Sequence, residues 1–209
     1  MDGLLIDSEA LYLKAMQAAA RTVGREMTLE FCHSMVGVPR AECNEMIQEL
    51  YGPAFDLVDF RSHYARHLSD FLAEGVPVKP GVVELLGFLH ERGLPRAVAS
   101  SAVRSAIESH LGRAGLLDRF SAYVGRDDVA RPKPAPDLYL EAARRLGVAP
   151  ENCIAFEDSS VGFAAAHAAG MRGFLVPDLL QPTDEARSRC VAVLPDLHQA
   201  RSILQSALA

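Results

Sequence analysis

The stretch Cys153–Pro177, CIAFEDSSVGFAAAHAAGMRGFLVP, decides the fold. Two short and almost continuously apolar runs, CIAFED and RGFLVP, flank a segment rich in alanine and other small residues. Runs that are apolar along most of their length are typical of parallel strands buried on both faces. The stretch therefore predicts a strand, a helix and a second strand of a parallel sheet, with the acidic pair Glu157-Asp158 at the end of the first strand.

Three further runs of this kind lie outside that stretch, namely RAVASS (96–101), SAYVG (121–125) and CVAVLPD (190–196). Helical patterns separate them. In residues 81–93, GVVELLGFLHERG, apolar side chains recur at i, i+3, i+4 and i+7, at Val82, Leu85, Leu86 and Leu89, which gives one apolar face. Strands that alternate with helices predict an α/β fold whose core is a Rossmann-like parallel sheet.

Residues 8–78 have a different texture. Helix formers dominate three segments there, and each segment ends at a glycine: 8–24, 40–52 and 60–75. No pattern in this part of the sequence favours a strand. We therefore expect an α-helical cap domain over residues 8–78, inserted near the start of an α/β core formed by residues 1–7 and 79–209.

Composition excludes several classes of function. Twenty-one Lys and Arg against 27 Asp and Glu give a net charge of −6, so no overall basic field would hold a nucleic acid. The four cysteines are scattered without metal-type spacing, and we expect neither a disulfide nor a zinc site. No apolar stretch approaches the roughly 18 to 20 residues that cross a bilayer. We expect a cytoplasmic protein without membrane partners, either a monomer or a weak homodimer.

Polar side chains gather where the predicted strands end, which is where α/β sheets normally bind their ligands. Taken singly, each has a purely structural explanation as a turn residue, a helix cap or a solvated cation. Together they supply metal ligands, a proton donor and both neutral and cationic donors to phosphate oxygens. The set, which suits phosphoryl transfer, consists of Asp2, Ser100, Lys133, Glu157 and Asp158.

The order of these motifs resembles that of the haloacid dehalogenase (HAD) superfamily, and within it the β-phosphoglucomutase-like phosphatases with a helical cap. The matching segments are DGLLIDSE (2–9), VASS (98–101), RPKPAPDLYL (131–140) and FEDSSVGFAAAHAAGM (156–171), so the resemblance covers essentially the whole chain. It implies a Mg²⁺-dependent phosphatase that acts on a small phosphorylated metabolite, a sugar phosphate in our interpretation, through an aspartyl-phosphate.

The resemblance also implies a role for each matching residue. Asp2 corresponds to the family's general acid and base, whose backbone carbonyl binds Mg²⁺. Ser100 corresponds to the hydroxyl that holds the transferring phosphate, and Lys133 to the lysine that neutralises its charge. Asp158 corresponds to a metal carboxylate, with Glu157 as a second ligand or as support through water.

The first motif of the family is an aspartate, any residue, a second aspartate and glycine. Because Asp2 matches the second aspartate, the nucleophilic first aspartate would stand directly before Met1. We expect Met1 to be an internal methionine of a longer protein. The alternative is a true start and a catalytically silent binding or interaction protein of the same fold.

The substrate is less clearly indicated. Arg40, in MVGVPRAE (35–42), matches a cap arginine that contacts the distal phosphate of a sugar substrate in relatives, although a surface arginine at a helix start fits the pattern equally well. Ser101 and Arg104 are further substrate-binding candidates, and the alternative for Arg104 is an exposed helix residue. A mutase would carry histidine at Tyr12 and a serine-lysine-asparagine run at 102–104, so a phosphatase is favoured over a β-phosphoglucomutase-type phosphomutase.

Overall fold

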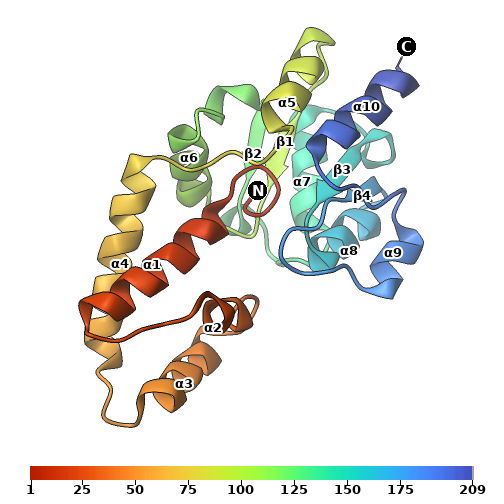
Figure 1. Ribbon diagram of the computed structural model, residues 1–209. Helices are drawn as coiled ribbons and strands as arrows, with labels where there is room; N and C mark the ends of the chain where they lie inside the picture. The colour runs from red at the N-terminus through yellow and green to blue at the C-terminus, as the bar shows by residue number, and fades with distance from the viewer. Residues whose placement is uncertain (209) are drawn as a thin grey trace. The chain divides into compact units, whose positions relative to one another are not determined.

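The computed structural model describes residues 1–208. The chain divides into two compact units, which are described separately (Figure 1). Met1–Asp7 and the residues from Pro77 onward form an α/β unit, and Ser8–Val76 form a helical unit.

Four strands form in the α/β unit, each within an apolar run that predicted a strand: β1 (Ala97–Ala99), β2 (Ala122–Val124), β3 (Ile154–Glu157) and β4 (Arg172–Leu175). All pairs are parallel, as predicted. β1 pairs with β2 and β3 pairs with β4, so the described strands make two separate two-stranded sheets. The α/β fold is confirmed, whereas a single continuous sheet is not formed by these residues.

The fifth predicted strand, at residues 190–196, is reduced to an isolated parallel bridge between Leu175 and Val193. Three backbone hydrogen bonds join this run to β4: Val191 N–H donates to Gly173 O at 2.8 Å, Leu175 N–H to Ala192 O at 3.0 Å and Leu194 N–H to Leu175 O at 2.7 Å. Pro195 has no N–H to continue a ladder. Asp196 is already the N-cap of the next helix, because its carboxylate accepts from Gln199 N at 2.9 Å.

Helices cover the sheets of this unit. α7 packs on both β1 and β2, and α8 packs on both β3 and β4. The α-helices are α5 (Val82–Glu91), α6 (Arg104–Arg113), α7 (Asp137–Leu146), α8 (Ser160–Ala168), α9 (Asp184–Arg189) and α10 (Leu197–Ala207), and the 3₁₀ turns are η1 (Leu117–Arg119), η2 (Arg126–Asp128) and η3 (Pro150–Asn152).

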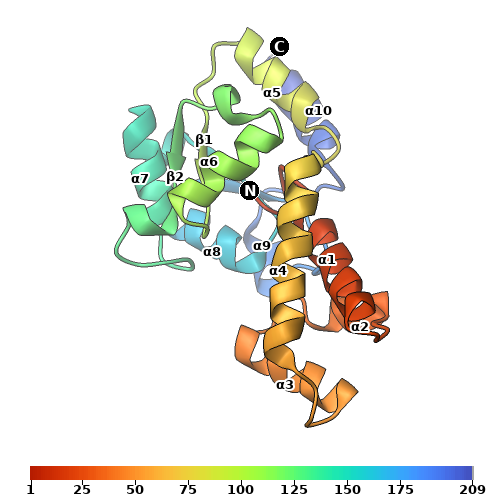
Figure 2. The same ribbon diagram turned by 90° about the vertical axis from the view of Figure 1, so that its left-hand side faces the viewer.

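α5 carries the predicted apolar face, with Val82, Leu85 and Leu86 buried. The helix lies beside α10 in both ribbon views (Figures 1 and 2). Gly81, which precedes α5, has φ of 84°, and a Cβ there would overlap the backbone of His198 in α10. Only glycine therefore allows the start of α5 to approach α10 this closely.

The helical unit contains α1 (Ser8–Thr22), α2 (Leu29–Ser34), α3 (Arg40–Tyr51) and α4 (Leu57–Glu74). The segments predicted at 8–24, 40–52 and 60–75 correspond to α1, α3 and α4, whereas α2 was not among them. α4 begins three residues before the predicted segment because the carboxylate of Asp56 caps it, accepting from Val58 N and Asp59 N. α1 packs along α4. The buried core of the unit consists of Ala19, Ala20, Met27, Cys32, Met35, Cys43, Ile47 and Phe60.

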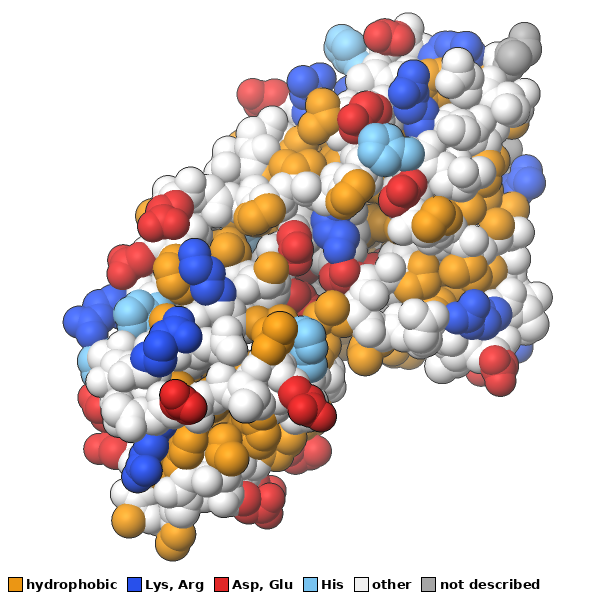
Figure 3. Space-filling view, in the orientation of Figure 1, with side chains coloured by type: hydrophobic (Ala, Val, Ile, Leu, Met, Phe, Trp, Pro, Cys, Tyr) orange, Lys and Arg blue, Asp and Glu red, His pale blue; other side chains and the backbone are white. Residues whose placement is uncertain are grey.

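Acidic and basic side chains are interspersed on the face shown in Figure 3, where Lys and Arg do not gather into one stripe. Every helix in residues 1–208 is too short or too polar to span a lipid bilayer.

Candidate active site

Lys133 is the centre of the candidate site. Its ammonium donates to the backbone oxygen of Ala99 at 3.2 Å and forms an ion pair with Glu157. Ala99 is the last residue of β1 and Glu157 the last of β3, so Lys133 joins the ends of the two separate sheets. Its side chain is only 9% exposed, which excludes the simple explanation of a solvated loop cation.

Glu157 is held by three donors. Lys133 and the hydroxyl of Tyr139 both donate to one carboxylate oxygen, and Ser159 Oγ donates to the other at 3.3 Å. Burial alone would raise the pKa of Glu157, but Lys133, the N-terminal amine and the hydrogen bond from Tyr139 together lower it, so the carboxylate is ionised. Since both carboxylate oxygens of Glu157 already accept hydrogen bonds, Glu157 is better suited to supporting a metal through water than to binding it directly.

The turn at Asp2-Gly3 lies against Asp158. Gly3 has φ of 72°, and a Cβ on it would stand 2.7 Å from Asp158 Oδ2 and 3.3 Å from Asp178 Oδ2. Asp178 also pairs with Lys79. Asp178 was not among the site residues predicted from the sequence. It follows the apolar run that contains β4, and Asp158 follows the strand β3.

Asp158 does not cap α8, because the N-cap is Ser159, whose hydroxyl accepts from Gly162 N at 3.1 Å. Burial raises the pKa of Asp158 to about 6, the N-terminal amine opposes this rise, and the neighbouring Glu157 carboxylate adds to it. Asp158 is therefore a partly buried carboxylate whose charge is poorly compensated by the protein alone.

This raised pKa predicts how stability depends on pH. The folded state holds the Asp158 proton more tightly than the unfolded chain, so this contribution is full below about pH 4 and is lost as the pH rises to about 6. In EDTA, Asp158→Asn should be more stable than the unsubstituted chain near neutral pH by about 1–3 kcal/mol. Urea unfolding at about pH 4 and about pH 7 measures the difference. An equal difference at both pH values would contradict the assignment.

Two further predicted site residues, Ser100 and Asp2, are sequence neighbours of Ala99 and Gly3, described above. Ser100 is buried at the end of β1, where its hydroxyl accepts from Ala102 N at 3.1 Å, so it caps a tight turn and not helix α6, whose N-cap is Val103. Ser101 follows on the surface of the same turn. Asp2 Oδ1 lies 3.6 Å from Nδ1 of His110, at the far end of α6. No sequence pattern indicated His110.

Arg104 lies elsewhere. Its guanidinium donates to Glu108 at 3.0 Å and approaches Asp128 at 3.9 Å, and its side chain is 47% exposed. The structure does not bring Arg104 into contact with Lys133 or Glu157.

The helical unit holds a cavity of about 460 Å³. Arg40, the first residue of α3, lines it together with Arg61 and Tyr64 of α4. Arg61 donates to Asn44 Oδ1 at 2.6 Å, and burial together with the charge of Arg40 lowers its pKa. The acidic residue Glu9 of α1 also lines this cavity. Two arginines beside one cavity can donate to an anionic ligand, and Arg61 adds to the arginine that the sequence indicated.

The donors beside Gly3 fit Mg²⁺. This ion prefers hard oxygen ligands and keeps several waters, so one or two carboxylates and a backbone carbonyl are sufficient. Asp158 supplies a carboxylate with a raised pKa, and the absence of a side chain at Gly3 lets this carboxylate lie close to the backbone of the Asp2-Gly3 turn. In residues 1–208 no three His, Cys, Asp or Glu side chains cluster as a metal site.

With this geometry in view, comparison with known proteins decides the family. The sequence pattern described as haloacid dehalogenase-like hydrolase matches residues 1–176. The chain belongs to this family. The phosphorylated carbohydrates phosphatase of Thermotoga maritima is a HAD relative that is 32% identical over 171 residues, covering 82% of this chain and 79% of that protein.

Two further HAD relatives agree. The fructose-1-phosphate phosphatase YqaB of Escherichia coli is 32% identical over 171 residues, covering 82% of this chain and 90% of that protein. A crystal structure of a HAD family hydrolase from Deinococcus radiodurans, with bound phosphate and sodium, is 28% identical with a TM-score of 0.86, covering 99% of this chain and 93% of that one. The resemblance read from the motifs is thus confirmed at the level of the HAD family.

Proposed function

We propose that this HAD protein is a Mg²⁺-dependent phosphatase that hydrolyses the phosphate ester of a small metabolite, a sugar phosphate. One observation carries the proposal: the buried Lys133 bridges the end of β1, next to Ser100, and the acidic end of β3. The relatives that act on phosphorylated carbohydrates and fructose 1-phosphate support the substrate class.

Each residue of the site has a part in this reaction. Ser100 and the turn that follows it donate hydrogen bonds to the phosphate, and Lys133 balances the charge that gathers on its oxygens. Asp2 gives a proton to the leaving oxygen and later takes one from water. Asp158 and the backbone carbonyl of Asp2 would hold Mg²⁺, which when bound supplies further positive charge beside the phosphate.

The nucleophile in this proposal is an aspartate directly before Met1, which would form the aspartyl-phosphate. The extended chain, used below, is the 209-residue chain preceded by an apolar segment that ends in this aspartate. It allows turnover to be measured separately from binding.

Binding of inorganic phosphate to the 209-residue chain tests the site itself. Titration calorimetry should show that Mg²⁺ strengthens phosphate binding, because the metal offsets the repulsion between phosphate and Asp158. In Asp158→Asn this gain should fall by about ten- to a hundredfold, the worth of one charge-assisted contact. Asp184→Asn, at the start of α9 on the surface, is the matched control and should leave the gain unchanged. Mg²⁺-enhanced binding that survives in Asp158→Asn would reject the metal assignment.

Arg40 is proposed to read an anionic group at the distal end of the substrate. In the extended chain, Arg40→Ala should lower kcat/KM by about ten- to a hundredfold for a sugar bisphosphate and leave a plain aryl phosphate unaffected. Arg66→Ala, on α4 but outside the cavity lining, is the control. Equal losses on both substrates would mean that Arg40 supports the helical unit and reads no ligand.

A further inference from the structure

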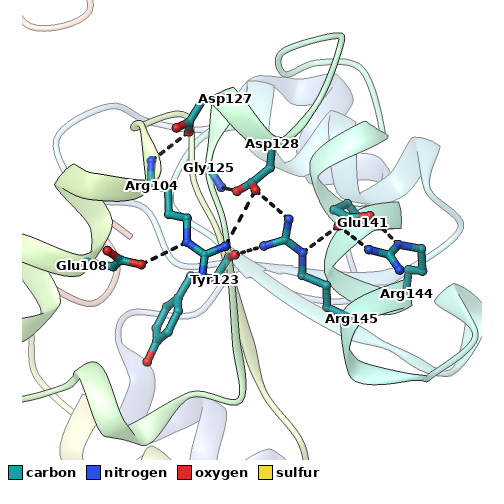
Figure 4. Close-up of polar contacts among 9 residues, drawn as sticks. All are labelled: Arg104, Glu108, Tyr123, Gly125, Asp127, Asp128, Glu141, Arg144 and Arg145. Carbon is teal, nitrogen blue, oxygen red and sulfur yellow. Dashed lines mark hydrogen bonds and ion pairs between the residues drawn. The ribbon is translucent and has the colours of Figure 1, made fainter.

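A chain of polar contacts connects the start of α6, which follows the Ser100 turn, with α7 (Figure 4). Arg145, near the end of α7, is its centre and is only 22% exposed. Its guanidinium donates to Asp128 Oδ1 at 2.7 Å, to the backbone oxygen of Tyr123 in β2 at 2.6 Å and to Glu141 at 2.6 Å. One side chain thus fastens α7 to a strand and to the 3₁₀ turn η2 at the same time.

η2 in turn fastens the Ser100 turn. The Arg126 N–H donates to Ala102 O at 2.9 Å, and the carboxylate of Asp127 accepts from Arg104 N at 2.8 Å, which caps the first turn of α6. Gly125 permits this approach, because a Cβ there would stand 2.6 Å from Arg104 N. The Gly125 N–H donates to the carboxylate of Asp128 at 2.8 Å, which closes η2. The same Asp128 carboxylate accepts from Arg145.

The opposite end of α7 adjoins the loop that contains Lys133, which is proposed above to balance the charge of the phosphate. Asp137, its first residue, accepts two bonds from Arg131, at 2.7 and 3.0 Å, and these close the loop that contains Lys133. Tyr139, two residues further on, contacts both Lys133 and Glu157. The position of α7 therefore determines where the Lys133 ammonium lies.

We propose that the Asp128–Arg145 pair is a positioning device that sets the Ser100 turn and the Lys133 loop at a fixed separation. Neither residue would touch the phosphate. The pair acts by locking η2, and with it the Ser100 turn, to the helix that carries Lys133. This inference rests on the proposed function for its link to phosphate, whereas the mechanical link between the two loops stands on the contacts alone.

The neighbouring Arg144 offers a matched control. It lies on the same helix, is 72% exposed and bonds only to Glu141. Arg145→Leu removes the link to Asp128 and Tyr123, whereas Arg144→Leu removes a charge of the same kind from the surface. Asp128→Asn is the milder variant, because an asparagine oxygen can still accept from Gly125 N while the ion pair is lost, and it replaces Arg145→Leu if that variant does not fold.

Two measurements on the 209-residue chain test the proposal. Hydrogen–deuterium exchange should become faster in residues 100–104 and in residues 131–136 of Arg145→Leu, and in neither segment of Arg144→Leu. Affinity for inorganic phosphate with Mg²⁺ should fall about five- to tenfold in Arg145→Leu and stay unchanged in Arg144→Leu. The double variant Asp128→Asn/Arg145→Leu should lose no more than Arg145→Leu alone, because the two residues act as a pair.

The outcomes separate this inference from the proposed function. Faster exchange confined to residues 125–128, or unchanged phosphate affinity in a folded Arg145→Leu, overturns the positioning role. If the unsubstituted chain binds no phosphate, the proposed function fails, and the exchange pattern still decides whether the pair holds the two loops together.

Discussion

The extended chain is expected to hydrolyse aryl phosphates in the presence of Mg²⁺ at least about a thousandfold faster than the 209-residue chain. Ser100, Lys133 and Asp158 can bind and polarise a phosphate, but none of them is a group that the proposed reaction uses for attack. Adding the aspartate supplies the group that bonds to phosphorus. Release of aryl alcohol, and trapping of an acid-stable phosphorylated chain, measure the gain.

The matched control is the same extension ending in asparagine, which adds the same apolar segment without a nucleophile. It should be as inactive as the 209-residue chain. Equal activity of the two extensions would reject the proposed nucleophile. Activity of the 209-residue chain that disappears on Asp2→Asn would show that Asp2 or a water molecule performs the attack, and an inactive extended chain would favour the silent binding protein.

Lys133→Met is expected to destabilise the fold by about 3–5 kcal/mol, because it leaves the buried carboxylate of Glu157 without its cation. The double variant Lys133→Met/Glu157→Gln removes both charges and should recover most of that loss. Urea unfolding of the single and double variants measures this difference.

Arg131→Met is the control for Lys133→Met. Arg131 lies two residues away and also pairs with a carboxylate, but its side chain is 69% exposed, so the loss should be much smaller than at Lys133. A loss at Lys133 no greater than that at Arg131 would show that Glu157 does not depend on the ammonium for its charge.

Periodicity and strand-end chemistry predicted much of this architecture. Three helices of the helical unit were readable from helix formers that end at a glycine, and the four strands from apolar runs, because both patterns are local. The run at 190–196 failed because apolar content does not show that a proline and a helix cap will end the pairing so early. That β1–β2 and β3–β4 form separate sheets depends on which strands meet, which no local pattern specifies.

The candidate site was predictable only in part. Lys133, Glu157 and Asp158 stand in recognisable motifs, and the structure brings them together. Asp178 could have been found by applying the same strand-end rule to β4. His110, Arg61 and Arg145 could not, because each meets its partner through tertiary packing and carries no local signal. Arg104 follows the predicted motif but is already engaged with Glu108 and Asp128.

The packing of α5 against α10 has a consequence for synthesis on the ribosome. α5 begins at Val82, whereas its partner α10 begins at Leu197, more than a hundred residues later. At about 5–20 residues per second, α5 waits roughly 6–23 s before α10 has been translated. During that interval the apolar side chains facing α10 have no native partner, so the nascent chain exposes a chaperone-binding surface until the last helix emerges.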